Sequence, residues 1–350
     1  MSPARWLEAG RSRFAGLSRP AAMGLLALVA IVIALGLWSP TTVTPSVANG
    51  AQNDLALYRA VVARVRKGEA YEHAAVIEQR ARGYPLRPFF VVRPPTLAEL
   101  LALTPDQNII RLVEAFLATT VIFAWTVRLS PLRSGAPWMA WTAACLFTGV
   151  GASMAGGVMS QLTEIWAGLL IALSLALRTE SRFAAAVILG LAAALIRELA
   201  APYLLAMALF AVIERRRAEA FAFVAALVIA AVALAWHAHQ VLALVTPGDR
   251  SSQGWLRLGG MSFVRSTEAW NLVVPLVGSW ATAVIAPLAL LGAASWKGST
   301  GIRLLSVLAG YLAAFLVFGR PENAYWGFLI VPLVAVGLTV APLALYDLVR

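Results

Sequence analysis

The sequence is poor in cysteine and in charged residues. Only 13% of its 350 residues are Asp, Glu, Lys or Arg. The one cysteine, Cys145, falls inside an apolar run, so a disulfide framework is excluded and the redox compartment cannot be inferred. The chain also lacks a Gly-rich phosphate loop of the Walker type, a Gly-x-Ser-x-Gly turn and a His-Glu-x-x-His motif. These absences disfavour an ATP-driven pump and a serine hydrolase.

Apolar runs dominate what remains. Hydrophobic residues make up 60% of the chain, and the mean hydropathy is +0.78, more apolar surface than a soluble globule of this length can hide. Runs near the length needed to cross roughly 30 Å of hydrocarbon recur throughout. We predict an all-α polytopic membrane protein with about ten transmembrane helices, forming one integral-membrane domain over 1–350. The predicted spans are 21–38, 109–127, 137–155, 162–177, 183–196, 200–213, 220–236, 273–294, 304–319 and 325–345.

Two of these segments admit a second interpretation. The first span follows a basic start, as a signal peptide would, but its apolar run is long and Ser39-Pro40-Thr41 is a poor cleavage site, which favours an uncleaved anchor. Residues 183–213 are long for one span and short for two. Arg197, Glu198 and Pro202 lie at their middle, and we predict two short helices that meet at a polar break.

The distribution of basic residues predicts the orientation. With the N-terminus inside, the short outer loops hold only Arg197 and Arg320. The short cytoplasmic loops hold Arg128, Arg133, Arg178, Arg182, Arg215, Arg216, Arg217, Lys297 and Arg303. We therefore predict a bacterial inner-membrane protein with both termini cytoplasmic, a basic tail at 1–20, and extracytoplasmic loops at 40–108 and 237–272. Topology explains the net charge of +11 better than a nucleic-acid partner does.

The first outer loop carries the candidate chemistry. Residues 53–67 have the pattern of a helix lying in the membrane interface, with Tyr58 on its apolar stripe. Asp54 is either the N-cap of this helix, as Asn53 could also be, or a general base for a sugar hydroxyl. The later arginines Arg82, Arg87 and Arg93 suit a phosphate leaving group, because guanidinium groups match phosphate oxygens in two-pronged fashion. Arg93 is preferred among them because two prolines fix the backbone beside it. The alternative for these arginines is contact with lipid phosphates.

These residues resemble the GT-C class of integral-membrane glycosyltransferases. The similar pattern is Asp54 with Tyr58, then Gly68-Glu69-Ala-Tyr71, then Arg93-Pro94-Pro95. The resemblance implies a substrate cavity on the outer side and a polyprenyl-phosphate-linked sugar as donor, and it leaves open whether the acceptor is a glycan, a lipid or a protein. The chain has Asn53 where many members carry a second acid, so a metal held by two acids is not implied and a divalent cation is left open as cofactor.

Other polar residues have both a functional and a structural interpretation. Arg197, Glu198, Arg320 and Glu322 could line the substrate site, or they could form ion pairs that hold breaks in helices. Tyr325 and Trp326 follow Arg320, and an aromatic belt at the membrane interface is the favoured account of them. The pair His237 and His239 has the wrong spacing to share a metal on a helix and lacks a third ligand, so no metal site is predicted there.

The leading hypothesis from the sequence is inverting glycosyl transfer at the outer face of the membrane. Asp54 would act on the acceptor hydroxyl, and Arg93 and Arg197 would stabilise the departing polyprenyl phosphate. The alternative is a transporter or flippase of a lipid-linked glycan or amphiphile, for which charges near the midplane and inverted repeats are typical. A purely structural membrane protein is the third hypothesis.

Overall fold

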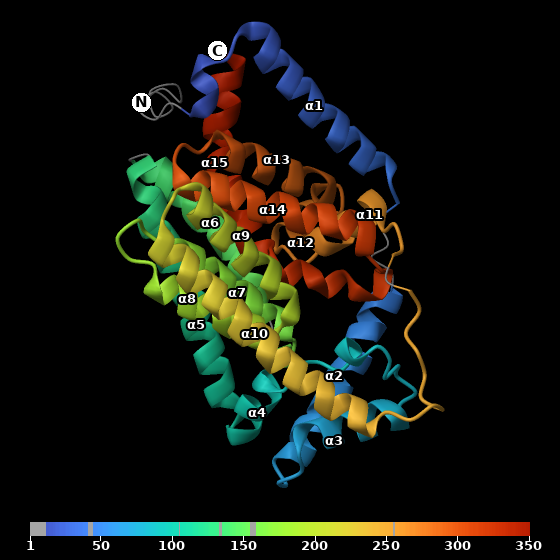
Figure 1. Ribbon diagram of the computed structural model, residues 1–350. Helices are drawn as coiled ribbons and strands as arrows, with labels where there is room; N and C mark the ends of the chain where they lie inside the picture. Colours follow the sequence, from blue (N-terminus) through green and yellow to red (C-terminus); the bar gives the residue numbers. More distant parts are fainter. Residues whose placement is uncertain (1–11, 41–44, 105, 133–134, 155–158, 255) are drawn as a thin grey trace.

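The computed structural model describes residues 12–40, 45–104, 106–132, 135–154, 159–254 and 256–350, with the backbone alone over 45–53 and 152–154 (Figure 1). The all-α prediction is confirmed for this part of the chain. Its α-helices are α1 (Arg19–Trp38), α2 (Pro45–Val65), α3 (Tyr71–Ala81), α4 (Thr96–Leu103), α5 (Gln107–Leu129), α6 (Ala136–Met154), α7 (Thr163–Leu177), α8 (Ala184–Ile196), α9 (Ala201–Ile213), α10 (Arg217–Leu244), α11 (Gly260–Glu268), α12 (Val273–Val277), α13 (Ala281–Ser295), α14 (Ser299–Phe318) and α15 (Val331–Val349). The 3-10 segments are η2 (Arg13–Gly16), η3 (Phe89–Val91), η4 (Ser130–Leu132), η5 (Glu198–Ala200) and η6 (Pro321–Leu329).

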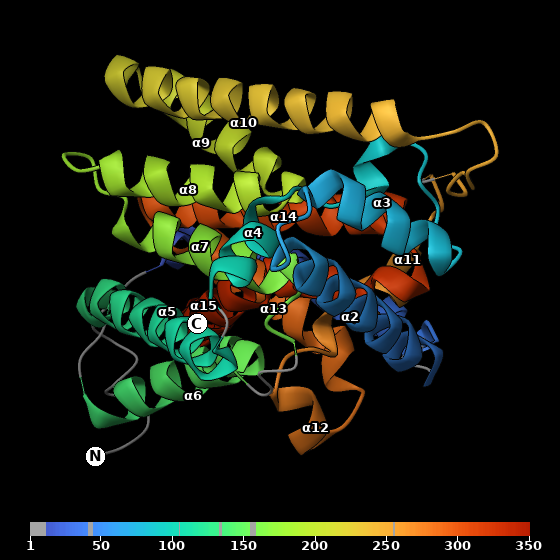
Figure 2. The same cartoon turned by 90° about the horizontal axis from the view of Figure 1, so that it is seen from below.

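Helix α15 lies at the centre of the bundle. It packs against α6, α13, α14 and α7, and α10 lies on the outside of α8 and α9 (Figures 1 and 2). Helices α2, α3 and α4 form one end of the molecule, and η2 and the C-terminal end of α15 lie at the other. A hydrogen bond of 2.6 Å from Ser12 N to the Asp347 carboxylate joins the two terminal segments. The first loop is thus separated from the termini by the length of the bundle.

The positions of glycine and proline explain where the long helices begin and end. Residues 217–244 contain neither, and they form one continuous helix that stops before Pro247-Gly248. Helix α14 begins after Gly298, whose φ of +90° suits glycine, and it ends before Pro321. Helix α10 extends beyond the predicted span at 220–236. His237 and His239 therefore lie in a helix and not in the loop expected at 237–272.

The number of spanning helices differs from the prediction. In the described ranges, five helices are long and apolar enough to cross a membrane, fewer than the about ten predicted. They are α1, α5 continued through η4 (Gln107–Leu132), α10, α14 and α15. The apolar helices α7, α8, α13 and the segment Glu198–Ile213 are shorter. A helix of 15 residues reaches only about 22 Å, less than the thickness of the hydrocarbon core.

Polar and conformational breaks shorten these segments. The predicted break at Arg197 is confirmed, since α8 ends at Ile196 and α9 begins at Ala201 after η5. The expected span at 273–294 is divided at Gly278, whose φ is +106°, into α12 and α13. The span expected at 325–345 begins within η6, which has a kink at Asn323. Apolar composition alone therefore overestimated the number of continuous spans.

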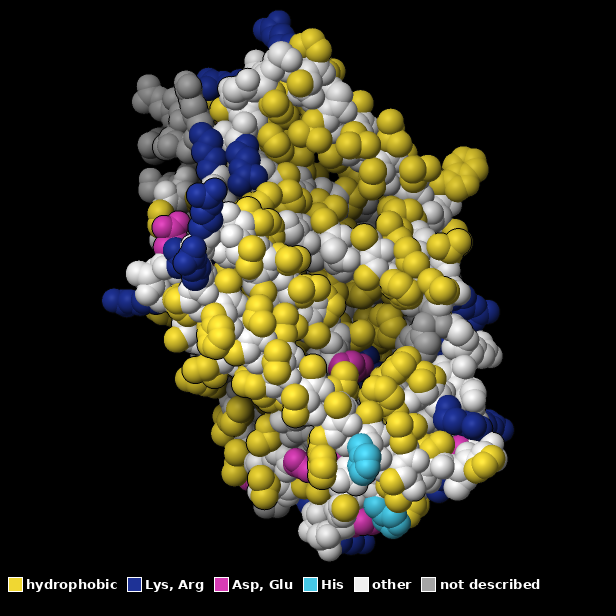
Figure 3. Space-filling model, viewed as in Figure 1, with side chains coloured by type: hydrophobic (Ala, Val, Ile, Leu, Met, Phe, Trp, Pro, Cys, Tyr) yellow, Lys and Arg dark blue, Asp and Glu magenta, His cyan; other side chains and the backbone are white. Residues whose placement is uncertain are grey.

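Apolar side chains cover much of the outer surface. In Figure 3 hydrophobic side chains occupy most of the visible face between the upper end, where Lys and Arg gather, and the lower end. Exposed examples are Phe116, Phe123 and Phe221, each more than two-thirds exposed. A soluble monomer rarely exposes so large a contiguous apolar area, whereas a bilayer requires it. The surface and the apolar helices fit a membrane protein.

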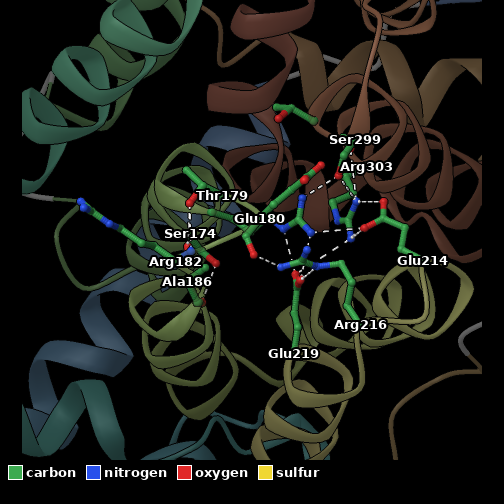
Figure 4. A network of polar contacts seen from close by, with 12 residues as sticks. Ser174, Thr179, Glu180, Arg182, Ala186, Glu214, Arg216, Glu219, Ser299 and Arg303 are labelled. Carbon is green, nitrogen blue, oxygen red and sulfur yellow. Dashed lines mark hydrogen bonds and ion pairs between the residues drawn. The ribbon is translucent and has the colours of Figure 1, made fainter.

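A buried charge cluster fixes the end of the bundle near the termini (Figure 4). Arg178, after α7, forms a two-pronged ion pair of 2.8 and 2.9 Å with Glu219 of α10. Arg303 of α14 pairs with Glu214 at 2.6 and 2.9 Å, and Arg216 also contacts Glu219. The side chains of Arg178, Glu219 and Arg303 are at most 2% exposed. Arginines from three loops that were predicted to be cytoplasmic thus form ion pairs with the same two glutamates.

Replacing Glu219 by Ala is expected to destabilise the protein by about 3–5 kcal/mol, because it leaves the buried Arg178 without its main counter-charge. The measurement is equilibrium unfolding in mixed micelles. Glu180→Ala is the matched control, since Glu180 is exposed and contacts the cluster only through its backbone carbonyl. Equal stability of the two variants would show that the cluster contributes little to folding.

Candidate functional site

Asp54 lies in the middle of α2 and faces two tyrosines. Its carboxylate accepts hydrogen bonds of 2.8 Å from the Tyr84 hydroxyl and 3.1 Å from the Tyr325 hydroxyl. The interpretation of Asn53 or Asp54 as an N-cap is wrong, because the helix begins at Pro45. Proline is well suited to the first turn of a helix, where its missing N–H costs nothing. The Asp54 carboxylate is therefore available for a tertiary site.

Each tyrosine is positioned by a local backbone feature. Gly83, with φ +71°, follows the end of α3 at Ala81. The Tyr84 amide then donates back to the Gln79 carbonyl at 2.9 Å, and the chain turns toward α2. Tyr325 belongs to η6, which lies so close to α7 that a Cβ on Gly168 would overlap the Phe328 carbonyl. Tyr325 is 1% exposed, so its interpretation as an interfacial belt residue is wrong. Trp326 is also buried.

Arg93 and Asp54 both form a hydrogen bond with the Tyr325 hydroxyl. Its Nη2 donates to the Tyr325 hydroxyl at 2.9 Å and its Nε to the Tyr58 hydroxyl at 3.2 Å. The Tyr71 hydroxyl donates to the Arg93 carbonyl at 2.8 Å, and Pro94-Pro95 follow at once, so the backbone is fixed on both sides of the residue. The Nη1 group forms no hydrogen bond with a residue that the structure describes. It is free to donate to a ligand.

A chain of buried charges continues from Arg93 into the bundle. The carboxylate of Glu164, in the first turn of α7, lies 3.8 Å from Arg93 Nη2 and 2.8 Å from Arg197 Nε. Arg197 also pairs with Glu198. Glu164 and Arg197 are each 1% exposed. Glu164 was not among the site residues predicted from the sequence, although a carboxylate at the start of an apolar segment is a signal that could have identified it.

Arg93 forms part of the wall of two neighbouring cavities. One has a volume of about 290 Å³ and a polar lining. Its lining residues are Asp54, Leu57, Tyr58, Gln79, Tyr84, Pro85, Val91, Arg93, Ser252, Arg320, Glu322, Asn323 and Tyr325. The other has a volume of about 390 Å³ and a mainly apolar lining from α9, α14 and η6. It is lined by Phe90, Arg93, Arg197, Glu198, Leu199, Pro202, Gly310, Tyr311, Ala314, Phe315, Phe318, Trp326 and Leu329.

The remaining sequence-predicted residues lie at the rim of the polar cavity or outside it. Arg320 lines the cavity and donates to the backbone carbonyls of Gln253 and Gly254, with Glu322 at 3.9 Å. Arg87 lines neither cavity and donates to the Pro247 and Asp249 carbonyls at 2.7 and 2.6 Å, which ties the loop after α10 to the first loop.

The histidine His237 has a structural role. It is buried, with Nδ1 3.1 Å from the Glu72 carboxylate and Nε2 3.1 Å from the Val92 carbonyl, and these contacts hold α10 against the first loop. In the described part of the chain, no group of three or more His, Cys, Asp or Glu residues is placed to hold a metal ion. The polar cavity combines the acids Asp54 and Glu322 with arginines and tyrosines.

Burial changes the acid–base properties of the site. It raises the pKa of Asp54 above its ordinary value, although the Tyr84 hydrogen bond and the positive charge of Arg93 act in the opposite direction. Burial also raises the pKa of Tyr58 to about 12 and raises that of Tyr84, so both stay protonated as hydrogen-bond donors. Asp54 is thus a stronger base than an exposed aspartate. The arrangement can accept a proton at Asp54 and stabilise an anion at Arg93.

Comparison of the chain with protein-family models, curated proteins and solved structures finds no match.

Proposed function

We propose that this protein is a membrane transferase that moves a sugar from a lipid-linked phosphate donor to an acceptor hydroxyl. The observation that carries the proposal is the position of Arg93 between a polar cavity with Asp54 and an apolar cavity lined by α9 and α14. A polyprenyl-phosphate sugar has the same order of parts: a polar group, an anionic junction and an apolar chain. The donor would lie with its phosphate at Arg93.

The residues have distinct roles in the transfer. Asp54 takes the proton of the acceptor hydroxyl, and the oxygen attacks the anomeric carbon of the donor sugar. The bond from that carbon to the phosphate oxygen breaks, and its electron pair leaves with the phosphate. Donors on Arg93 stabilise the departing anion, because guanidinium N–H groups in a site shielded from water bind phosphate strongly. Attack on the face opposite the leaving group inverts the anomeric centre.

The buried charges behind Arg93 support this assignment. Arg197 is held between Glu164 and Glu198, so the ion pairs occupy its guanidinium, whereas Arg93 keeps Nη1 unengaged. Glu164 anchors both arginines and fixes their spacing. We propose that Arg93 makes the direct phosphate contact and that Arg197 lines the start of the apolar cavity.

Transport of a lipid-linked glycan is the second candidate. The buried series Arg93, Glu164, Arg197 and Glu198 favours it, since charges in the interior of a bundle often mark a transport path. The two candidates differ in whether a covalent bond changes. Asp54, with its raised pKa, is required as a base for transfer and not for transport.

The test is sugar transfer in proteoliposomes that contain the purified protein and polyprenyl-phosphate donors with radiolabelled sugars. Release of the unglycosylated polyprenyl phosphate, with the label on a new acceptor, supports transfer. Movement of intact donor between leaflets without release supports transport and contradicts the transferase proposal. Empty liposomes control for spontaneous hydrolysis and flipping.

The pH dependence of transfer follows from the raised pKa of Asp54. Activity requires the ionised carboxylate, so it is lost as the pH falls through a value above 3.8, the ordinary pKa of an aspartate. Tyr84→Phe should move this acid limb to still higher pH, because the Tyr84 hydrogen bond lowers the pKa of Asp54. The acid limbs of the wild type and of Tyr84→Phe are measured from kcat/KM between pH 4 and 8. An unchanged limb in Tyr84→Phe would argue against Asp54 as the titrating base.

A further inference from the structure

A second large groove lies at the end of the molecule that carries the termini, away from Asp54. It runs between α5 and the turn from α7 to α8, with a volume of about 1050 Å³. Its lining residues are Thr120, Phe123, Ala124, Val127, Arg128, Pro131, Ala176, Leu177, Thr179, Ser181, Arg182, Phe183, Ala184 and Ala185. This volume is at the upper end of the range of small-molecule sites.

The two walls of the groove carry side chains of different size, large ones on α5 and small ones on α7 and α8. On α5, Phe123 and Val127 lie one helical turn apart and are 69% and 54% exposed. The opposite wall is formed by the methyl groups of Ala176, Ala184 and Ala185. Large side chains facing alanines leave a channel with apolar walls, which suits an acyl chain and not a polar ligand.

Two arginines give the groove a basic end. Arg128 donates one hydrogen bond of 2.6 Å, from Nη2 to the Thr300 hydroxyl, and a guanidinium has five donors. The side chain of Arg182 points away from the buried charge cluster in Figure 4 and forms no hydrogen bond or ion pair with a described residue. Thr179 and Ser181 line the same part of the groove.

Among the residues that the structure describes, no acid lines this groove. Glu214 and Glu219 are held by the arginines of the buried cluster, and Glu180 does not line the groove. We propose that the groove binds one anionic phospholipid, with an acyl chain along Phe123 and Val127 and the phosphate at Arg128 and Arg182. Basic pockets between transmembrane helices on the cytoplasmic side bind anionic head groups in this way. The site is independent of the transfer reaction.

The charge requirement is tested by native mass spectrometry of the purified protein in an equimolar mixture of phosphatidylglycerol and phosphatidylcholine with the same chains. The wild type is expected to retain one phosphatidylglycerol in preference, and Arg182→Gln should lower this preference roughly fivefold. Arg217→Gln is the matched control, because Arg217 is an exposed arginine outside the groove. Equal retention of both lipids, or an equal effect of Arg217→Gln, would overturn the proposal.

The apolar requirement is tested by filling the groove without a change of charge. Ala185→Trp should abolish retention, whereas Ala231→Trp, on the exposed face of α10, should not. Inorganic phosphate in millimolar excess is added to distinguish a lipid from a free anion. Retention that survives phosphate supports the lipid site; displacement by phosphate, or unchanged retention in Ala185→Trp, would contradict it.

Discussion

Replacing Asp54 by Asn is expected to lower the rate of sugar transfer by about 10²–10⁴-fold, the usual contribution of a general base. The amide oxygen can still accept a hydrogen bond from one of the two tyrosines, and the NH2 group that replaces the second oxygen can donate to the other hydroxyl, but the amide cannot take a proton from the acceptor. Donor affinity should change little, because the proposed contacts of the donor phosphate and apolar chain are with Arg93 and the apolar cavity, which Asp54 does not line. Initial rates at saturating donor and equilibrium donor binding are the two measurements.

The same substitution should not reduce stability. A raised pKa means that the ionised carboxylate is less favourable in the folded protein than in the unfolded chain, so its contribution to stability falls as the pH rises above the ordinary pKa of Asp. The neutral amide removes this cost at pH 7, and the melting temperature of Asp54→Asn should equal or exceed that of the wild type. Glu99→Gln, at an exposed acid of the same loop, is the control. Full transfer by Asp54→Asn would remove the base assignment.

The first loop shows which features of a site are local in the sequence. Tyr58 lies on an apolar stripe that the sequence displays, Asp54 precedes it by about one turn, and Arg93 lies beside two prolines, so all three were predicted. The helix start was not, because Asn53 and Pro45 are both acceptable N-terminal signals and only tertiary packing decides between them. Local patterns located the segment but not its exact limits.

The partners of Asp54 depend on long-range folding. Tyr84 is 30 positions away and Tyr325 is 271 positions away. No local pattern distinguishes a tyrosine that will be buried on a carboxylate from one in an interfacial belt. The helix count has a similar cause, since hydropathy averages over a window and does not detect a break such as Gly278 within the predicted span 273–294.

Replacing Arg93 by Gln is expected to lower transfer by about 10²–10³-fold, comparable to the loss of one donor to a developing anion. It should also weaken donor binding, because Nη1 is the unengaged donor between the two cavities. Arg93→Lys should recover little activity, since an ammonium keeps the charge but not the planar fork. Arg82→Gln is the matched control, at a surface arginine of the same loop that lines neither cavity.

A structural defect must be separated from a loss of phosphate contact, because Arg93 also lies 3.8 Å from the buried Glu164. Arg93→Gln alone leaves Glu164 with only Arg197 as its ionic partner. The double variant Arg93→Gln with Glu164→Gln removes the charge imbalance, and its melting temperature should return toward that of the wild type. Transfer should stay low in the double variant, since the donor to the phosphate is still missing. Recovery of transfer together with stability would mean that Arg93 acts by holding the fold, and the leaving group would then require another arginine, for which Arg320 at the rim of the polar cavity is the next candidate.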